Sequence, residues 1–131
     1  MARPIRHLLV TAVAAVCMVG LSAPAIGDTK TIKAFGDPGS FHWHPKSREI
    51  SKGDKIVWKN TTNTQHKVVA YGDNWSKDST IAANGGKTSK RFKKTGTFKF
   101  RCTIGEGTPS AHSELSGGQC EGMCGKVRVT S

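Results

Sequence analysis

The sequence predicts an all-β domain, specifically a Greek-key β-sandwich of seven to eight strands. Short segments in which apolar and polar residues alternate recur along residues 28–131, and this pattern is typical of half-buried strands. Turn-forming Gly, Asn, Asp and Pro residues separate these segments. No segment after residue 27 keeps a 3.6-residue apolar period. Many short strands joined by such turns favour a sandwich over a helical or mixed fold.

Residues 1–27 are predicted to be a signal peptide that is cleaved near residues 25–27. Arg3 and Arg6 precede an apolar stretch over residues 8–20, and Ala23-Pro24-Ala25 fits the small-x-small cleavage pattern. A retained membrane anchor is the alternative, but a span needs roughly 20 strongly apolar residues, and Thr, Ser and Pro dilute this stretch. We therefore expect an exported protein in the periplasm, the cell envelope or the extracellular space.

The remaining residues 28–131 are enough for a single domain with one core. The formal charge of the whole chain is +11, and removing Arg3 and Arg6 with the signal leaves about +9. A basic surface favours anionic partners, so we expect a partner protein with an acidic docking surface, an anionic envelope surface or nucleic acid, and a monomer. Export argues against nucleic acid. The alternative is a merely solvated surface, because the lysines are scattered rather than gathered in one run.

Three cysteines follow the signal, and an odd number in an exported protein leaves one thiol to explain. Cys120 and Cys124 are four positions apart and could form a disulfide if the segment between them turns tightly. Cys102 would then be the free thiolate.

The first half of the domain is predicted to contain strands over residues 28–35, 48–51 and 55–60. The last two are joined by Lys52-Gly53-Asp54, a tight turn, and together predict a hairpin. Phe41 to Pro45 is expected to be a semi-exposed strand edge. His42 and His44 would share one face of it, so a second, surface metal site is the alternative interpretation.

The second half is predicted to contain strands over residues 66–71, 79–82, 87–94, 97–102 and 126–130. His66 shares a face with the apolar residues of its strand. In residues 97–102, Phe98, Phe100 and Cys102 alternate with Thr97, Lys99 and Arg101, so Cys102 is expected to point inward.

A long Gly- and Ser-rich loop follows Cys102 and holds His112, and Met123 comes just before the last strand. A thiolate, an imidazole and a thioether form a soft ligand set that suits copper.

At this point the sequence resembles the cupredoxins, the plastocyanin/azurin-like small blue copper proteins. The matching stretches are residues 50–60, 66–69, 96–102 and 122–129, in this order, and they cover nearly the whole mature chain. The resemblance implies a type 1 centre with one copper ion that alternates between Cu(I) and Cu(II) and is used for one-electron transfer. By position, its ligands would be His66, Cys102, His112 and an axial Met123. It further implies that backbone N–H groups near Lys67 bond the Cys102 sulfur.

The spacing between Cys102 and His112 departs from this family, in which only a few residues separate the cysteine from the second histidine. Nine residues separate them here, and we interpret residues 105–111 as an insertion. A loop of this kind lengthens at modest entropic cost. Glu106 or Glu114 is the alternative to Met123 near the metal.

A binuclear copper site built on Cys120 and Cys124 is a rival interpretation within the same fold. It would need a histidine and a methionine shortly after the second cysteine, but residues 126–129 are Lys, Val, Arg and Val. It would also leave Cys102 unused, so we rank it below a type 1 site.

Three other function classes are alternatives to an electron-transfer protein. An exported copper carrier or buffer would expose many Met and His side chains, whereas Met123 is the only methionine after the signal. A metal-free sandwich with structural cysteines would bind no copper. An enzyme is disfavoured, because a nucleophilic cysteine needs exposure and an orienting third group, and Cys102 is expected to face inward.

Overall fold

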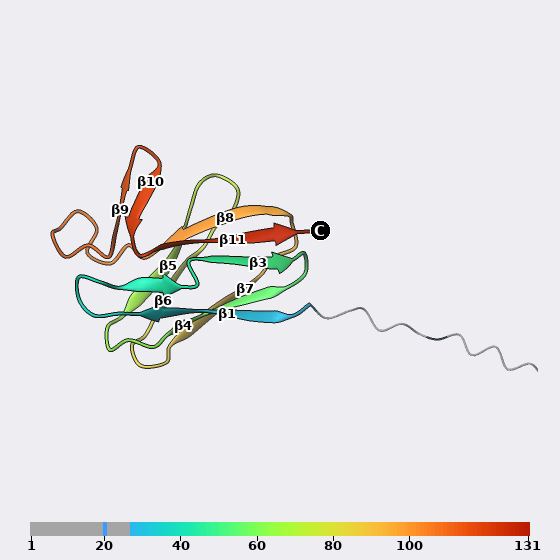
Figure 1. The fold of residues 1–131 in the computed structure, drawn as a ribbon, viewed down its shortest axis with the longest axis horizontal. Helices are drawn as coiled ribbons and strands as arrows, with labels where there is room; N and C mark the ends of the chain where they lie inside the picture. Colours follow the sequence, from blue (N-terminus) through green and yellow to red (C-terminus); the bar gives the residue numbers. More distant parts are fainter. Residues whose placement is uncertain (1–19, 21–26) are drawn as a thin grey trace, which may run out of the picture.

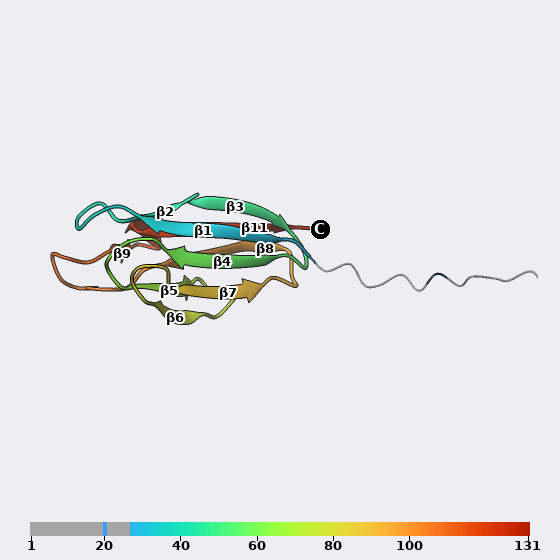
Figure 2. The same cartoon turned by 90° about the horizontal axis from the view of Figure 1, so that it is seen from below.

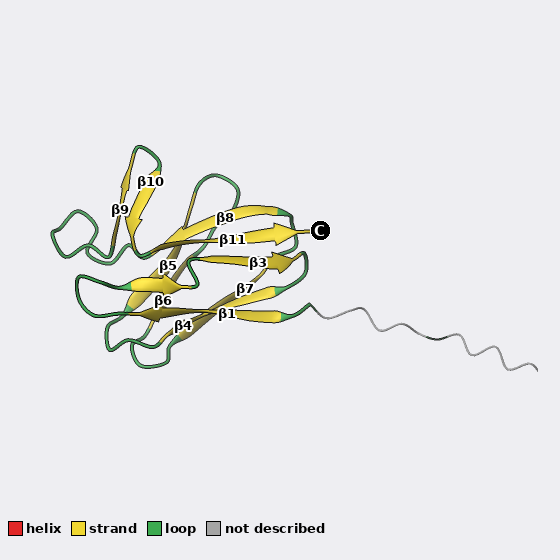
Figure 3. Ribbon diagram, viewed as in Figure 1, coloured by secondary structure: helices red, strands yellow, loops and turns green. Residues whose placement is uncertain are grey.

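The computed structural model describes residue 20 and residues 27–131. The predicted signal peptide therefore lies outside the described residues, apart from its last position and residue 20. Over the described part of the chain, eleven strands form two packed sheets and a separate two-stranded ribbon (Figures 1 and 3). The described part of the chain contains no helix that is long and apolar enough to span a bilayer. The prediction of an all-β sandwich is confirmed, with more strands than expected.

One sheet has four strands in the order β2-β1-β4-β7. Their bounds are β1 Thr29–Phe35, β2 His42–His44, β4 Lys55–Asn60 and β7 Lys87–Arg91. β1 runs parallel to β4 and antiparallel to β2, so the sheet is mixed. Seen from below, β1 and β4 lie in front of β11 and β8 of the other sheet (Figure 2).

The other sheet has five strands in the order β3-β11-β8-β5-β6. Their bounds are β3 Ser47–Ser51, β5 His66–Tyr71, β6 Asp78–Ile81, β8 Gly96–Arg101 and β11 Cys124–Thr130. β11 runs parallel to β3 and antiparallel to β8. The ribbon pairs β9 Ser113–Ser116 with β10 Gln119–Gly122 and lies at the end of the sandwich opposite the C-terminus (Figure 1).

The core is formed by the inward-facing residues of both sheets, as the alternating pattern predicts. Trp58 of β4 and Phe100 of β8 are fully buried, and their ring centroids lie 5.3 Å apart. Trp43 of β2 packs against the same phenyl ring at 5.7 Å. These aromatic contacts between the sheets bring the end of β8 up against the inner face of β2.

The predicted hairpin over residues 48–60 is wrong, because its two strands belong to different sheets. The turn between them passes from one sheet to the other. Lys52 donates its backbone N–H to the carbonyl of Thr130 in the five-stranded sheet, and Gly53 donates its backbone N–H to the carbonyl of Phe92, just beyond β7 of the four-stranded sheet. Asp54 stabilises this turn by accepting from the backbone N–H of Ser51. Apolar alternation in both strands fits a hairpin and a sheet-to-sheet crossing equally well.

Three further features of the fold bear on the sequence-based expectations. The segment around His42 is indeed a strand edge, since β2 lies at the margin of its sheet. The strand predicted over residues 87–94 ends at Arg91, and Phe92 beyond it is buried rather than exposed. The β9–β10 ribbon was not predicted, because its residues are mostly Gly, Ser and charged residues with no apolar alternation.

Candidate metal centre

His66 begins β5 and is fully buried. Its Nε2 lies 2.8 Å from the hydroxyl of Thr62. That hydroxyl donates its own proton to a carbonyl oxygen, either the side-chain amide of Asn60 at 2.8 Å or the backbone of Thr64 at 3.0 Å. It therefore accepts from the Nε2–H of His66, and this leaves a lone pair on Nδ1, the nitrogen that faces the other candidate ligands.

Cys102 directly follows β8 and is fully buried, so the predicted inward orientation is confirmed. Its sulfur accepts a hydrogen bond of 3.2 Å from the backbone N–H of Lys67, as the family resemblance implied. Burial raises the pKa of the thiol, although backbone N–H groups of Lys67 and Ile104 and the charges of Lys67 and Arg101 oppose this shift. The metal-free thiol therefore keeps its proton at neutral pH, and a bound metal must displace it.

His112 lies in the loop before β9 and is partly exposed. Its backbone N–H donates to Ile104 and its carbonyl accepts from Met123, so both sides of the residue are fixed. Burial, and secondarily the charge of His112, lowers the pKa of His66 to about 4. Burial also lowers the pKa of His112. Both imidazoles are therefore neutral at pH 7 and can act as metal ligands.

The candidate ligand atoms of His66, Cys102 and His112 all lie within 4.8 Å of one another. The two Nδ1 atoms are 3.1 Å apart. The Cys102 sulfur lies 3.4 Å from Nδ1 of His112 and 3.8 Å from Nδ1 of His66. Two imidazoles and one thiolate in a triangle form the donor set of a blue copper centre. The cluster is consistent with one type 1 copper ion.

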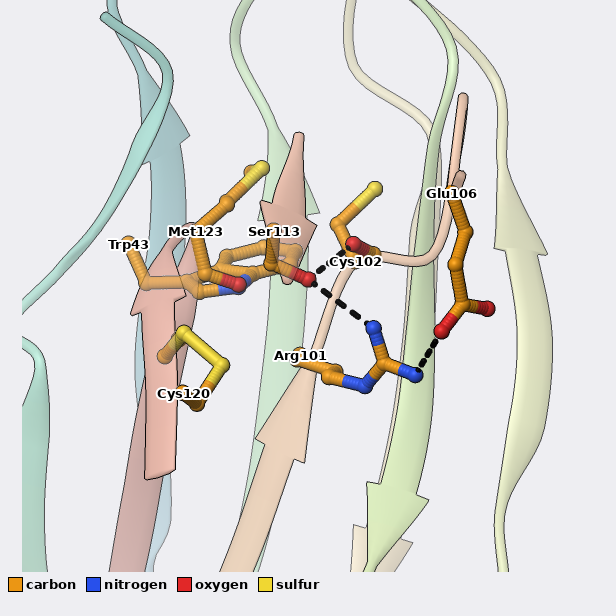
Figure 4. The surroundings of a disulfide bond; sticks show 8 residues. Trp43, Arg101, Cys102, Glu106, Ser113, Cys120 and Met123 are labelled. Carbon is orange, nitrogen blue, oxygen red and sulfur yellow. Dashed lines mark hydrogen bonds and ion pairs between the residues drawn. A yellow bond between two sulfur atoms is a disulfide. The ribbon is translucent and has the colours of Figure 1, made fainter. Parts of the chain in front are cut away.

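Met123 is fully buried at the junction between the ribbon and β11. Its carbonyl accepts from the backbone N–H of Cys102 at 3.1 Å and from the indole N–H of Trp43 at 3.2 Å. Figure 4 shows the sulfur atoms of Met123 and Cys102 directed toward the same end of the sandwich. The backbone of the predicted axial residue is thus tied to the residues around the cluster.

Aromatic side chains of β2 and of the segment before it pack against the histidines of the cluster. The ring centroid of Phe41 lies 4.7 Å from that of His66 and 4.8 Å from that of His112. Trp43 lies 6.3 Å from His66. An apolar wall of this kind limits solvent access and lowers the local dielectric constant around a metal.

Arg101 anchors the loop that follows β8, and the sequence alone does not identify it as part of the site. The alternation places it on the outer face of β8, yet it is buried, because Glu106 forms an ion pair with its guanidinium and Ser113 lies 3.4 Å from it (Figure 4). The Ser113 hydroxyl also donates to the carbonyl of Cys102. The loop that carries His112 is therefore fastened to the end of β8.

The two glutamates that are alternative candidates for metal ligands have other partners. Glu106 pairs with Arg101, and Glu114 accepts from the backbone N–H of Gly107 at 3.3 Å. Neither carboxylate belongs to the cluster that the described residues form around Cys102.

Cys120 and Cys124 form a disulfide, as the cysteine arithmetic suggested. Within the described residues Cys102 is the free cysteine. The rival binuclear interpretation is contradicted, because it requires two free thiolates at the positions that form this disulfide.

Residues 30–130 match the family model described as copper binding proteins of the plastocyanin/azurin family. This match spans most of the chain, so the protein belongs to that family. Among curated proteins, plastocyanin from Sambucus nigra is 29% identical over 105 residues, covering 72% of this chain and 93% of the relative. Plastocyanin from Rumex obtusifolius is 28% identical over 109 residues, covering 75% and 97%.

Solved structures with a similar fold include a plastocyanin and a purple cupredoxin. Oxidised plastocyanin from Dryopteris crassirhizoma superimposes with a TM-score of 0.57 at 16% identity, covering 77% of this chain and all of that one (100%). A purple cupredoxin from Nitrosopumilus maritimus superimposes with a TM-score of 0.55 at 18% identity, covering 76% and 98%. At these identities the likeness supports the fold alone.

Proposed function

We propose that this protein is an exported, monomeric carrier of single electrons between redox proteins, with no enzymatic activity of its own. The observation that supports this most is the convergence of two imidazole nitrogens and one sulfur, which lie within 4.8 Å of one another. Bound copper would supply one-electron chemistry by alternating between Cu(I) and Cu(II). His66, Cys102 and His112 would hold it as the strong ligands, with Met123 as a weak fourth ligand that tunes its potential.

The chain contributes rigidity and the exclusion of water. Hydrogen bonds fix His66 through Thr62, Cys102 through the backbone of Lys67, and His112 through its own backbone. A ligand set held in one geometry rearranges little when the charge of its metal changes, and this keeps the barrier to electron transfer small. The N–H donated to the Cys102 sulfur tunes the redox potential.

A partner would dock at the groove beside His112. This groove is lined by small and apolar residues and by no Lys, Arg, Asp or Glu: Pro38, Gly39, Phe41, Thr64, Pro109, Ser110, Ala111, His112 and Gly122. A groove without charge costs little to desolvate on docking. The excess of Lys and Arg elsewhere would steer partners that carry acidic groups around their own contact face.

The first experiment is to add Cu(II) to the purified protein and record its visible absorption and electron paramagnetic resonance spectra. We expect an intense band from thiolate-to-copper charge transfer and a narrow copper hyperfine splitting. Replacing Cys102 with Ser should abolish both while circular dichroism shows the fold retained. A C102S variant that stays blue would overturn the proposal. Ordinary copper spectra in the wild type would instead indicate a copper carrier or buffer.

The role of Met123 is tested by exchange for Leu, which keeps the volume of the side chain but removes the thioether. Copper should remain bound and the redox potential should shift, because the axial ligand tunes the potential rather than holding the ion. An unchanged potential would mean that Met123 is not the axial ligand.

A further inference from the structure

His42 and His44 both project from the outer face of β2, away from the buried cluster. Both are exposed, whereas Phe41 and Trp43, which alternate with them, point inward against the cluster. Residues two apart on a strand project on the same face with their Cα atoms roughly 7 Å apart. β2 also lies at the margin of its sheet (Figure 2), so one side of the pair has no neighbouring strand in that sheet.

The imidazole of His42 is held in an orientation that suits a metal ligand. Its Nδ1 lies 3.1 Å from the carbonyl oxygen of Ser40 and donates its proton to it, because a carbonyl can only accept. The tautomer is thereby fixed and Nε2 keeps a lone pair. A ligating histidine commonly has its other nitrogen bonded to a carbonyl in this way.

Phe35 of the neighbouring strand β1 lies next to both imidazoles. Its ring centroid is 6.2 Å from that of His42, in a stacked arrangement, and 6.1 Å from that of His44, in an edge arrangement. Phe35 is itself 39% exposed, one of two large apolar side chains so exposed in the described part of the chain. One aromatic ring therefore borders both histidines.

We propose that His42 and His44 form a second, surface site for Cu(II), which holds the ion with two imidazole nitrogens while water completes its coordination. Imidazole is a preferred ligand of Cu(II), and the site lies on the outer face of the same strand whose inner face packs against the buried cluster. This site goes beyond electron transfer: it gives the protein a place to take up copper from solution. Lys33 lies opposite His44 in the strand register, and its charge makes this site weaker than the buried one.

The test uses the full chain, first given one equivalent of copper(II) sulfate and then titrated with more in a buffer that does not bind copper. We expect the second ion to give an ordinary Cu(II) resonance with nitrogen hyperfine structure, separate from any type 1 signal. His42→Asn and His44→Asn should each weaken this second binding at least about tenfold, the equivalent of one lost ligand. Both side chains point to solvent, so both variants should keep the circular dichroism of the wild type.

Ser47→Asn is the matched control, since Ser47 is an exposed residue of the next strand, β3, and offers no imidazole. It should leave the second binding unchanged. The proposal is overturned if H42N and H44N bind the second ion as tightly as the wild type, or if S47N abolishes that binding. The ordinary and the type 1 signals are read separately. Absence of the blue band would therefore refute the proposed electron-carrier function, while the ordinary signal still tests the proposed site at His42 and His44.

Discussion

Replacing either partner of the ion pair between Arg101 and Glu106 should have a different effect on the free energy of unfolding. The side chain of Arg101 is 8% exposed, whereas that of Glu106 is 48% exposed. If Arg101 is replaced with Met, Glu106 can turn to water, and the chain also loses Arg101 Nε, a buried donor without a partner. If Glu106 is replaced with Ala, a buried guanidinium loses its countercharge.

The expected magnitudes follow from this difference in exposure. Removing one partner of a fully buried ion pair costs about 3–5 kcal/mol. Glu106 is half exposed, so water compensates in part, and we expect about 2 kcal/mol for Glu106→Ala. Arg101→Met keeps most of the apolar packing and removes a buried charge, so we expect no more than about 1 kcal/mol. The double variant should cost about as much as Arg101→Met alone, which corresponds to a coupling energy of about 2 kcal/mol.

The assay is urea unfolding of the metal-free protein with the disulfide intact, followed by tryptophan fluorescence. Glu49→Ala is the matched control, since this glutamate of β3 is exposed and has no ion-pair partner within the described residues. It should change the free energy of unfolding by less than about 0.5 kcal/mol. If Arg101→Met were more destabilising than Glu106→Ala by more than about 1 kcal/mol, the argument from exposure would be refuted.

Three further predictions concern pH, copper uptake and the disulfide. Because burial lowers the pKa of His66 to about 4 from the ordinary 6.5, the unfolded chain binds more protons between these values. Stability of the metal-free protein should therefore fall as pH drops from 6.5 toward 4, by about 3 kcal/mol from His66, with a further contribution of the same sign from His112. Urea unfolding that is flat across this window would contradict the burial argument. The pKa of the Cys102 thiol is raised while both imidazoles are neutral, so copper uptake at pH 7 should release about one proton. Calorimetry in buffers of different ionisation enthalpy measures the number of protons released. Release near zero would mean that the thiol is already ionised. Replacing Cys120 and Cys124 with Ser should cost about 2 kcal/mol of stability, the loop-closure value for so short a ring, and should shift the copper potential, because Met123 lies inside that ring. An unaltered potential would show that the disulfide does not position Met123.

Much of the candidate site follows from the sequence. Alternation in residues 97–102 predicts that Cys102 faces inward at the end of a strand, and the structure confirms it. The same local pattern places His66 at the start of its strand, on the buried face. Strand periodicity is a local property, so a side chain's face can be assigned without knowing its partner strand.

The pairing of strands could not be derived in the same way. Residues 48–51 and 55–60 have the pattern of a hairpin, but the turn at Gly53 carries the chain from one sheet to the other. Parallel pairing of β1 with β4 joins segments that are far apart in the sequence. Such pairings depend on which strands bury their apolar faces in the same core, and the residues of a single strand do not specify its neighbours.

Fold class, strand faces and ligand types follow from the amino-acid sequence alone, because periodicity and residue chemistry are local properties. Three other facts depend on the folded chain. His66, Cys102 and His112 meet within 4.8 Å, Arg101 is buried by the loop that follows it, and His42 and His44 share an outer face next to Phe35. Each of these facts joins residues whose contact depends on the path of the whole chain. Distance in space between remote residues is fixed only when the two sheets pack on one core.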